Sequence, residues 1–210
     1  MSINFSSLTA IKQDISKYND VSFMAVTKNR SESDILDLYN HNILLFGENK
    51  VQEAKKKFSS LNLKNISLHL IGPLQTNKVK DALNIFDCIQ SIDREKLVVE
   101  ILKNKKKLSQ FKTSDYFIQI NIGEEEQKSG VNIKDTKDFY NYCLESKLNV
   151  VGLMCIPPNS MNNDKYFNKM ANIKNDINPK LKLSMGMSND YTIALRCKSN
   201  LIRIGSKLFV

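Results

Sequence analysis

The feature that most constrains this chain is a regular alternation of short apolar runs with amphipathic segments. Eight short runs are rich in Val, Ile, Leu, Phe or Met, and several are apolar throughout. Runs of this kind are typical of strands buried on both faces, as in parallel sheets. We therefore expect strands at residues 21–27, 43–48, 67–72, 87–93, 115–122, 149–156, 182–188 and 201–206.

Helical periodicity occupies the segments between these runs. Ser31 and Asp34 have the spacing of a capping box, and Ile35, Leu38 and Tyr39 follow at helical intervals. We expect helices at 31–41, 50–60, 75–84, 94–107, 133–147, 164–176 and 189–198, with one more at 5–18 before the first strand. Eight strands with intervening helices predict an α/β fold, a single-domain (β/α)8 barrel over residues 1–210, with an open doubly wound sheet as the alternative.

Composition narrows the class of protein. The chain is 41% hydrophobic and 25% charged, as in ordinary globular proteins, and no run approaches the roughly 18 apolar residues of a membrane span. The N-terminus has no secretory signal pattern. Four scattered cysteines and two distant histidines predict neither a disulfide framework nor a metal site, so a cytoplasmic location is expected.

The formal net charge of +9 has three readings: a nucleic-acid partner, a phosphorylated ligand, or solubility alone. Much of the excess lies in lysine clusters at 55–57 and 103–107, at the expected ends of amphipathic helices. We favour solvated helix faces over a nucleic-acid surface.

Lys28 stands out because the apolar run Phe-Met-Ala-Val at 23–26 leads almost directly to it. In a barrel of this class, functional groups lie at the carboxyl ends of the strands. Partial burial there would lower the pKa of the amine, and a neutral amine is what Schiff-base formation with an aldehyde requires. The alternative is a lysine that ends a strand and points into water.

The last two strands end in residues suited to an anion. Ser184, Gly186 and Ser188 occur at the seventh, and Arg203, Gly205 and Ser206 at the eighth. Phosphate sites in these barrels frequently lie in the loops after strands seven and eight. Small residues in tight turns would explain either motif alone. Together with Lys28 they indicate a site for an aldehyde that carries a phosphate, and pyridoxal 5′-phosphate (PLP) has both groups.

Asn49 and His69 are weaker candidates. Asn49, in the Phe-Gly-Glu-Asn motif at 46–49, could equally orient a ligand or cap the following helix. His69 lies inside an apolar strand and is more simply a hydrogen-bonded core histidine than a catalyst.

The sequence closely resembles the YggS/PROSC family of pyridoxal phosphate homeostasis proteins. The matching segments are Ala-Val-Thr-Lys at 25–28, Phe-Gly-Glu-Asn at 46–49, His-Leu-Ile-Gly at 69–72, Gln-Ile-Asn-Ile at 119–122, Lys-Ser-Gly at 128–130, Gly-Leu-Met-Cys-Ile-Pro at 152–157, Leu-Ser-Met-Gly-Met-Ser at 183–188 and Arg-Ile-Gly at 203–205. They run in order over nearly the whole chain. Lys50 and Leu68 depart from the family pattern, which commonly has Tyr and Trp there.

The resemblance implies a barrel like the N-terminal domain of alanine racemase (PLP fold type III), with PLP held as a Schiff base on Lys28. It also implies phosphate contacts from Ser184, Gly186 and the turn from Arg203 through Gly205 to Ser206, with Arg203 near the pyridine nitrogen.

Members of this family act in intracellular PLP (vitamin B6) homeostasis without robust catalysis. We therefore expect a non-enzymatic monomer that binds PLP, with PLP-dependent apo-enzymes as partners and neither nucleic acid nor membrane among them. An amino-acid racemase is the alternative, but racemisation needs a base on each face of the cofactor. In the related racemases a second domain supplies that base.

Overall fold

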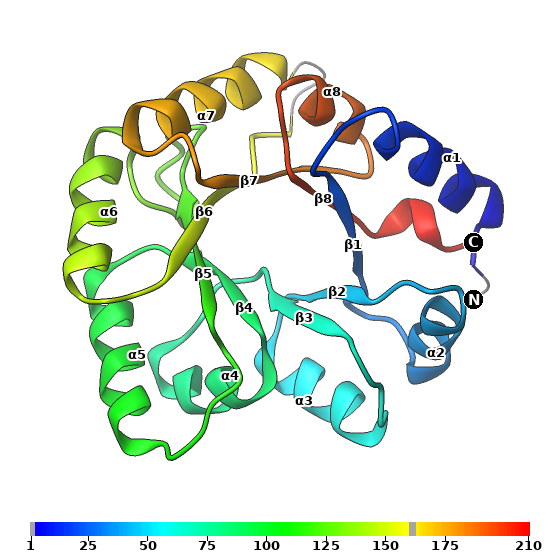
Figure 1. The fold of residues 1–210 in the computed structure, drawn as a ribbon, viewed down its shortest axis with the longest axis horizontal. Helices are drawn as coiled ribbons and strands as arrows, with labels where there is room; N and C mark the ends of the chain where they lie inside the picture. Colours follow the sequence, from blue (N-terminus) through cyan, green and yellow to red (C-terminus); the bar gives the residue numbers. More distant parts are fainter. Residues whose placement is uncertain (1–2, 160–162) are drawn as a thin grey trace.

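The chain folds into a closed barrel of eight parallel strands, surrounded by helices (Figure 1). The structure is a computed structural model that describes residues 3–159 and 163–210. The strands are β1 (Ser22–Val26), β2 (Leu45–Glu48), β3 (Ser67–Leu70), β4 (Cys88–Ile92), β5 (Asp115–Ile120), β6 (Val150–Cys155), β7 (Lys182–Met187) and β8 (Leu201–Ile204). β8 pairs with β1, with Leu201 opposite Ser22, so the sheet has no edge. The predicted barrel is confirmed and the open sheet is wrong.

The helices cover the outside of the barrel in chain order. They are α1 (Phe5–Ile15), α2 (Glu32–Asn40), α3 (Val51–Ser60), α4 (Val79–Ile85), α5 (Glu95–Lys107), α6 (Thr136–Glu145), α7 (Asp164–Ile177) and α8 (Tyr191–Arg196), with short 3-10 helices η1 (Thr76–Lys78), η2 (Ile133–Asp135) and η3 (Ser206–Leu208). The predicted capping box at the start of α2 is present. The Ser31 hydroxyl accepts from the Asp34 backbone N–H at 3.2 Å, and an Asp34 carboxylate oxygen accepts from the Ser31 N–H at 2.9 Å.

Alternation along each strand separates an outer core from the barrel interior. On β1, Phe23 and Ala25 belong to the large apolar cluster that packs against the helices. Met24 and Val26 instead join a small separate cluster with Leu201 of β8. These residues fill the middle of the barrel, as the two-residue period of a strand requires.

The two ends of the described chain meet beside α1. Ile3 forms an antiparallel bridge with Phe209, and the Asn4 N–H donates to the Leu208 carbonyl at 2.9 Å. Across residues 3–159 and 163–210, no helix has the length and apolar character needed to cross a bilayer.

Candidate functional site

A cavity of about 1070 Å³ opens at the carboxyl ends of the strands, where the sequence places the site. Five of the seven predicted site residues line it: Lys28, Asn49, Arg203, Gly205 and Ser206. They come from the ends of β1, β2 and β8, so the closure of the barrel brings Lys28, near the start of the sequence, together with Ser206, near its end.

Lys28 has a fixed backbone and a free side chain. The preceding Thr27 hydroxyl donates to Glu48 at 2.7 Å, and the following Asn29 N–H donates to Glu53 at 2.6 Å. The Lys28 amine has no hydrogen-bond or ion-pair partner among the described residues. The side chain is exposed, so the partial burial expected from the sequence is wrong: β1 ends at Val26, and Lys28 stands beyond it at the mouth.

The turn that carries Lys28 is anchored by a buried ion cluster. The Lys57 ammonium contacts Glu48 and Glu53 and donates to the Thr27 carbonyl at 2.7 Å. Burial raises the pKa of Glu48, against the opposing hydrogen bonds from Lys57 and Thr27. The cluster therefore ties α3 to the end of β1. It also corrects one expectation, because Lys57 is buried and does not belong to a solvated lysine face.

Arg203 is a buried cation on the cavity wall, only 3% exposed. It donates to the Ser184 carbonyl at 2.7 Å, the Ser184 hydroxyl at 2.8 Å and the Cys155 carbonyl at 2.7 Å. Burial lowers its pKa, but a guanidinium stays protonated in proteins. Because these acceptors are neutral, its positive charge is not cancelled by an ion pair within the described chain.

The turn at Gly205 and Ser206 lies against the end of β7. The Ser188 hydroxyl accepts from the Gly205 N–H at 3.2 Å and from the Lys207 N–H at 3.4 Å. The backbone N–H groups of Asn189 and Ser206 have no hydrogen-bond acceptor in the described part of the chain. Free N–H groups and hydroxyls at one cavity wall form a suitable cradle for an anion.

Ser184 and Gly186 lie outside the cavity lining. Ser184 is fully buried in β7, directly behind Arg203. Gly186 has a φ of +93°, and a Cβ there would lie 2.5 Å from the Ala194 Cβ. It therefore permits close packing of β7 against α8, and this packing supports the turn at Gly205 and Ser206.

Several lining residues were not singled out from the sequence: Gln119, Lys128, Ser129, Met187, Asn189 and Asp190. Lys128 pairs with Glu125 at 2.5 Å and belongs to the loop after β5. The Lys-Ser-Gly motif at 128–130 was the available signal. It lies well beyond the end of β5, so the expectation that functional groups directly follow the strands did not place it at the cavity.

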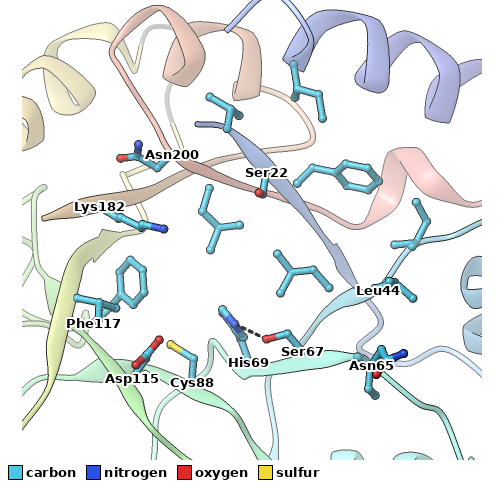
Figure 2. A pocket seen from close by; sticks show the side chains of 18 of the residues that line it. Ser22, Leu44, Asn65, Ser67, His69, Cys88, Asp115, Phe117, Lys182 and Asn200 are labelled. Atoms are coloured by element: carbon cyan, nitrogen blue, oxygen red, sulfur yellow. Dashed lines mark hydrogen bonds between the residues drawn. The ribbon is translucent and has the colours of Figure 1, made fainter. Parts of the chain in front are cut away.

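A second cavity, of about 800 Å³, opens at the opposite mouth of the barrel (Figure 2). We call it the lower cavity; it is lined at the amino ends of the strands by Ser22, Ser67, His69, Cys88, Asp115 and Lys182, among mainly apolar neighbours. Burial lowers the pKa of His69 to about 4, against the nearby carboxylates of Asp87 and Asp115. Its ring is hydrogen-bonded on both nitrogens, as expected, but the residue is partly exposed at this cavity and does not belong to the apolar core.

Comparison with known proteins identifies the relatives of this barrel. No protein-family model matches the chain. It is 35% identical over 200 residues to the pyridoxal phosphate homeostasis protein of Aquifex aeolicus, covering 91% of this chain and 87% of that protein. The Helicobacter pylori (strain J99) protein of the same name is 36% identical over 200 residues, covering 92% and 89%. The chain belongs to the pyridoxal phosphate homeostasis protein family.

Solved structures agree with this family membership, which confirms the resemblance noted in the sequence. PipY of Synechococcus elongatus, solved without PLP, superposes with a TM-score of 0.87 at 28% identity, covering 98% of this chain and 99% of PipY. PipY with PLP bound gives 0.85 at 27% identity. Alanine racemase from Bartonella henselae gives 0.74 at 15% identity, covering 97% of this chain and 58% of the racemase, and so shares the fold.

Proposed function

We propose that this pyridoxal phosphate homeostasis family member binds PLP in the cavity at the carboxyl ends of the strands, which we call the upper cavity, and buffers the intracellular pool of the cofactor without catalysis. The observation that carries the proposal is the convergence of three complementary groups on one cavity: the free Lys28 amine, the buried Arg203 cation and the N–H-rich turn at Gly205 and Ser206. When bound, PLP supplies an aldehyde that condenses with an amine and a phosphate that anchors it.

The residues present fit that group. Lys28 offers a primary amine whose backbone is held by the cluster around Lys57. The backbone N–H groups of Asn189 and Ser206 and the hydroxyls of Ser188 and Ser206 are available to the phosphate, and Asn49 also lines the cavity. The half-exposed side chains of Met187 and Ile156 provide apolar surface for a flat ring. In this arrangement Ser184 acts by holding Arg203, and Gly186 acts by allowing the packing that supports the turn at Gly205 and Ser206.

Arg203 favours a carrier over an amino-acid racemase. A guanidinium that faces the ring nitrogen donates to it and opposes its protonation, which weakens the ring as an electron sink. The named relatives are homeostasis proteins. We extend the proposal to a monomeric single domain over residues 1–210 that passes PLP to PLP-dependent apo-enzymes. Failure of the loaded protein to exchange the α-proton of alanine in deuterated water supports the carrier; exchange at an enzymatic rate would establish the racemase.

A spectroscopic titration tests the binding function. PLP added to the wild-type protein should produce the absorbance band of an imine, saturating at one equivalent. Lys28→Ala should lose this band while keeping its unfolding temperature, since an exposed side chain contributes little to stability. Lys50→Ala is the matched control, because Lys50 is also exposed, lies at the start of α3 next to Asn49 and does not line the cavity. An equal loss in both variants, or a full band in Lys28→Ala, would refute the assignment.

A further inference from the structure

A continuous chain of hydrogen bonds crosses the barrel interior, from the upper cavity to the lower one. The Arg203 guanidinium donates to the Ser184 hydroxyl at 2.8 Å, and that hydroxyl donates to Gln90 Oε1 at 2.6 Å. Gln90 Nε2 lies 2.8 Å from His69 Nδ1, and His69 Nε2 lies 3.0 Å from the Ser67 hydroxyl. These residues come from β8, β7, β4 and β3, so the chain spans the inside of the barrel.

The chemistry of the groups gives this chain a single direction. Arginine only donates, so the Ser184 oxygen accepts from it and its own proton points to the Gln90 carbonyl oxygen. The Gln90 amide nitrogen is then a donor to His69, whose Nδ1 must be unprotonated. The proton of the neutral ring therefore lies on Nε2 and is donated to Ser67.

Burial makes this chain of hydrogen bonds costly to break. Gln90 and Ser184 are both 0% exposed, and Arg203 is 3% exposed. A donor or acceptor that loses its partner in such a place has no water to replace it. The direction of the chain therefore holds the guanidinium in one rotation.

That rotation decides what Arg203 can offer to a ligand. Both N–H groups of Nη1 are used by Ser184, and one of Nη2 by the Cys155 carbonyl. The Nε–H and the second Nη2 N–H have no acceptor in the described chain, and the residue lines the upper cavity. These are the two donors left for the acceptor nitrogen of a pyridine ring.

We propose that Ser184, Gln90 and His69 are positioning residues that fix the Arg203 guanidinium for the ring nitrogen of the cofactor. This inference rests on the proposed PLP function for its ligand, but the positioning itself is a property of the protein alone. His69 borders the lower cavity (Figure 2), at the mouth opposite the upper cavity. A substitution at this far end therefore changes the upper site without touching it.

The first test uses the protein without cofactor. In ¹⁵N NMR, the His69 ring should show the Nε2–H tautomer, and the Arg203 guanidinium should give separate signals from slow rotation. Gln90→Leu should merge the Arg203 signals. His69→Gln should change their chemical shifts, although His69 lies at the other end of the hydrogen-bond chain. Ser91→Ala is the control, because Ser91 follows Gln90 on β4 and has a buried hydroxyl without a partner. An Nδ1–H tautomer, or Arg203 signals that Gln90→Leu leaves unchanged, would overturn the proposal.

The second test uses the loaded protein. Ser184→Ala removes one link with the smallest change in volume, and serves if Gln90→Leu does not fold. It should shift the absorbance maximum of bound PLP and weaken its retention about fivefold, the value of one hydrogen bond. Lys28 should still be labelled on reduction. Unchanged spectrum and affinity would contradict the positioning role. If the wild-type protein itself binds no PLP, the proposed function fails, and the cofactor-free test still decides whether the chain holds Arg203.

Discussion

Lys28 and Arg203 line the same cavity, but their side chains lie in opposite environments. The Lys28 amine is exposed and unpartnered on a backbone held by Thr27 and Asn29. The Arg203 guanidinium is buried and held on three neutral acceptors. The first arrangement leaves an amine accessible for condensation, and the second leaves a rigid donor. Truncation of Arg203 would also leave buried carbonyls unpaired, so we expect Arg203→Ala to lose stability as well as cofactor.

His69 is partly exposed at the lower cavity and hydrogen-bonded on both ring nitrogens, and its lowered pKa predicts how stability depends on pH. Its folded pKa of about 4 lies below the ordinary value of 6.5, so the unfolded chain takes up this proton more readily. The contribution is therefore full above about pH 6.5 and is lost as the pH falls toward 4. Between pH 7 and 5, the free energy of unfolding should fall by up to about 2 kcal/mol more in the wild type than in His69→Gln. Parallel curves from denaturant titrations would show that folding does not lower the pKa of His69.

At the scale of elements, the apolar runs located every strand because most strand residues are buried; β3, in which Ser67 and His69 are partly exposed, is the clearest exception. The predicted strands run one or two residues too long, for instance to Gly72 and Ser206, where the chain turns to form the rim. α4 begins with the 3-10 turn η1, and α8 starts only at Tyr191. In the turn that precedes α8, the Met187 N–H donates to the Asp190 carboxylate at 2.6 Å. This local contact leaves no trace in the hydrophobic pattern.

The site was predictable where side chains follow strand ends, as at Lys28 and Arg203. Sequence alone does not tell whether a residue such as Ser184 faces the cavity or lies beneath it, because both positions belong to the interior face of a strand. Gln90 was missed for the same reason: it is a polar residue within an apolar strand, and its partners come from strands distant in sequence.

The packing of β7 against α8 predicts the effect of one glycine substitution. Gly186→Ala places a Cβ 2.5 Å from Ala194 at a φ of +93°, so we expect a loss of about 2–3 kcal/mol in the free energy of unfolding. Gly205→Ala is the control, because its Cβ would meet Val26 at an ordinary 3.5 Å and its φ is −119°. Equal stability of the two variants in denaturant titration would contradict this account of the junction.

At the scale of the whole molecule, the net charge of +9 includes lysines whose ammonium groups contact carboxylates or aromatic rings. Lys55 pairs with Asp81 at 3.0 Å and Lys103 with Glu100 at 3.5 Å, while Lys105 lies 4.7 Å from the centre of the Phe111 ring. Lysines whose ammonium groups already contact a carboxylate or a ring bind the phosphates of a nucleic acid weakly.

We therefore expect no specific retention on nucleic acid at physiological salt. Chromatography on immobilised double-stranded DNA and RNA should release the protein below about 150 mM salt. Retention that falls steeply with log salt above that concentration would restore the nucleic-acid hypothesis.

The most direct test of the central claim is to map the lysine that PLP labels. The protein is incubated with one equivalent of PLP, reduced with borohydride, digested and analysed by mass spectrometry. The account predicts stoichiometric modification of Lys28, with the other surface lysines essentially unmodified. Diffuse labelling of the lysine clusters at 55–57 and 103–107, with Lys28 untouched, would contradict it.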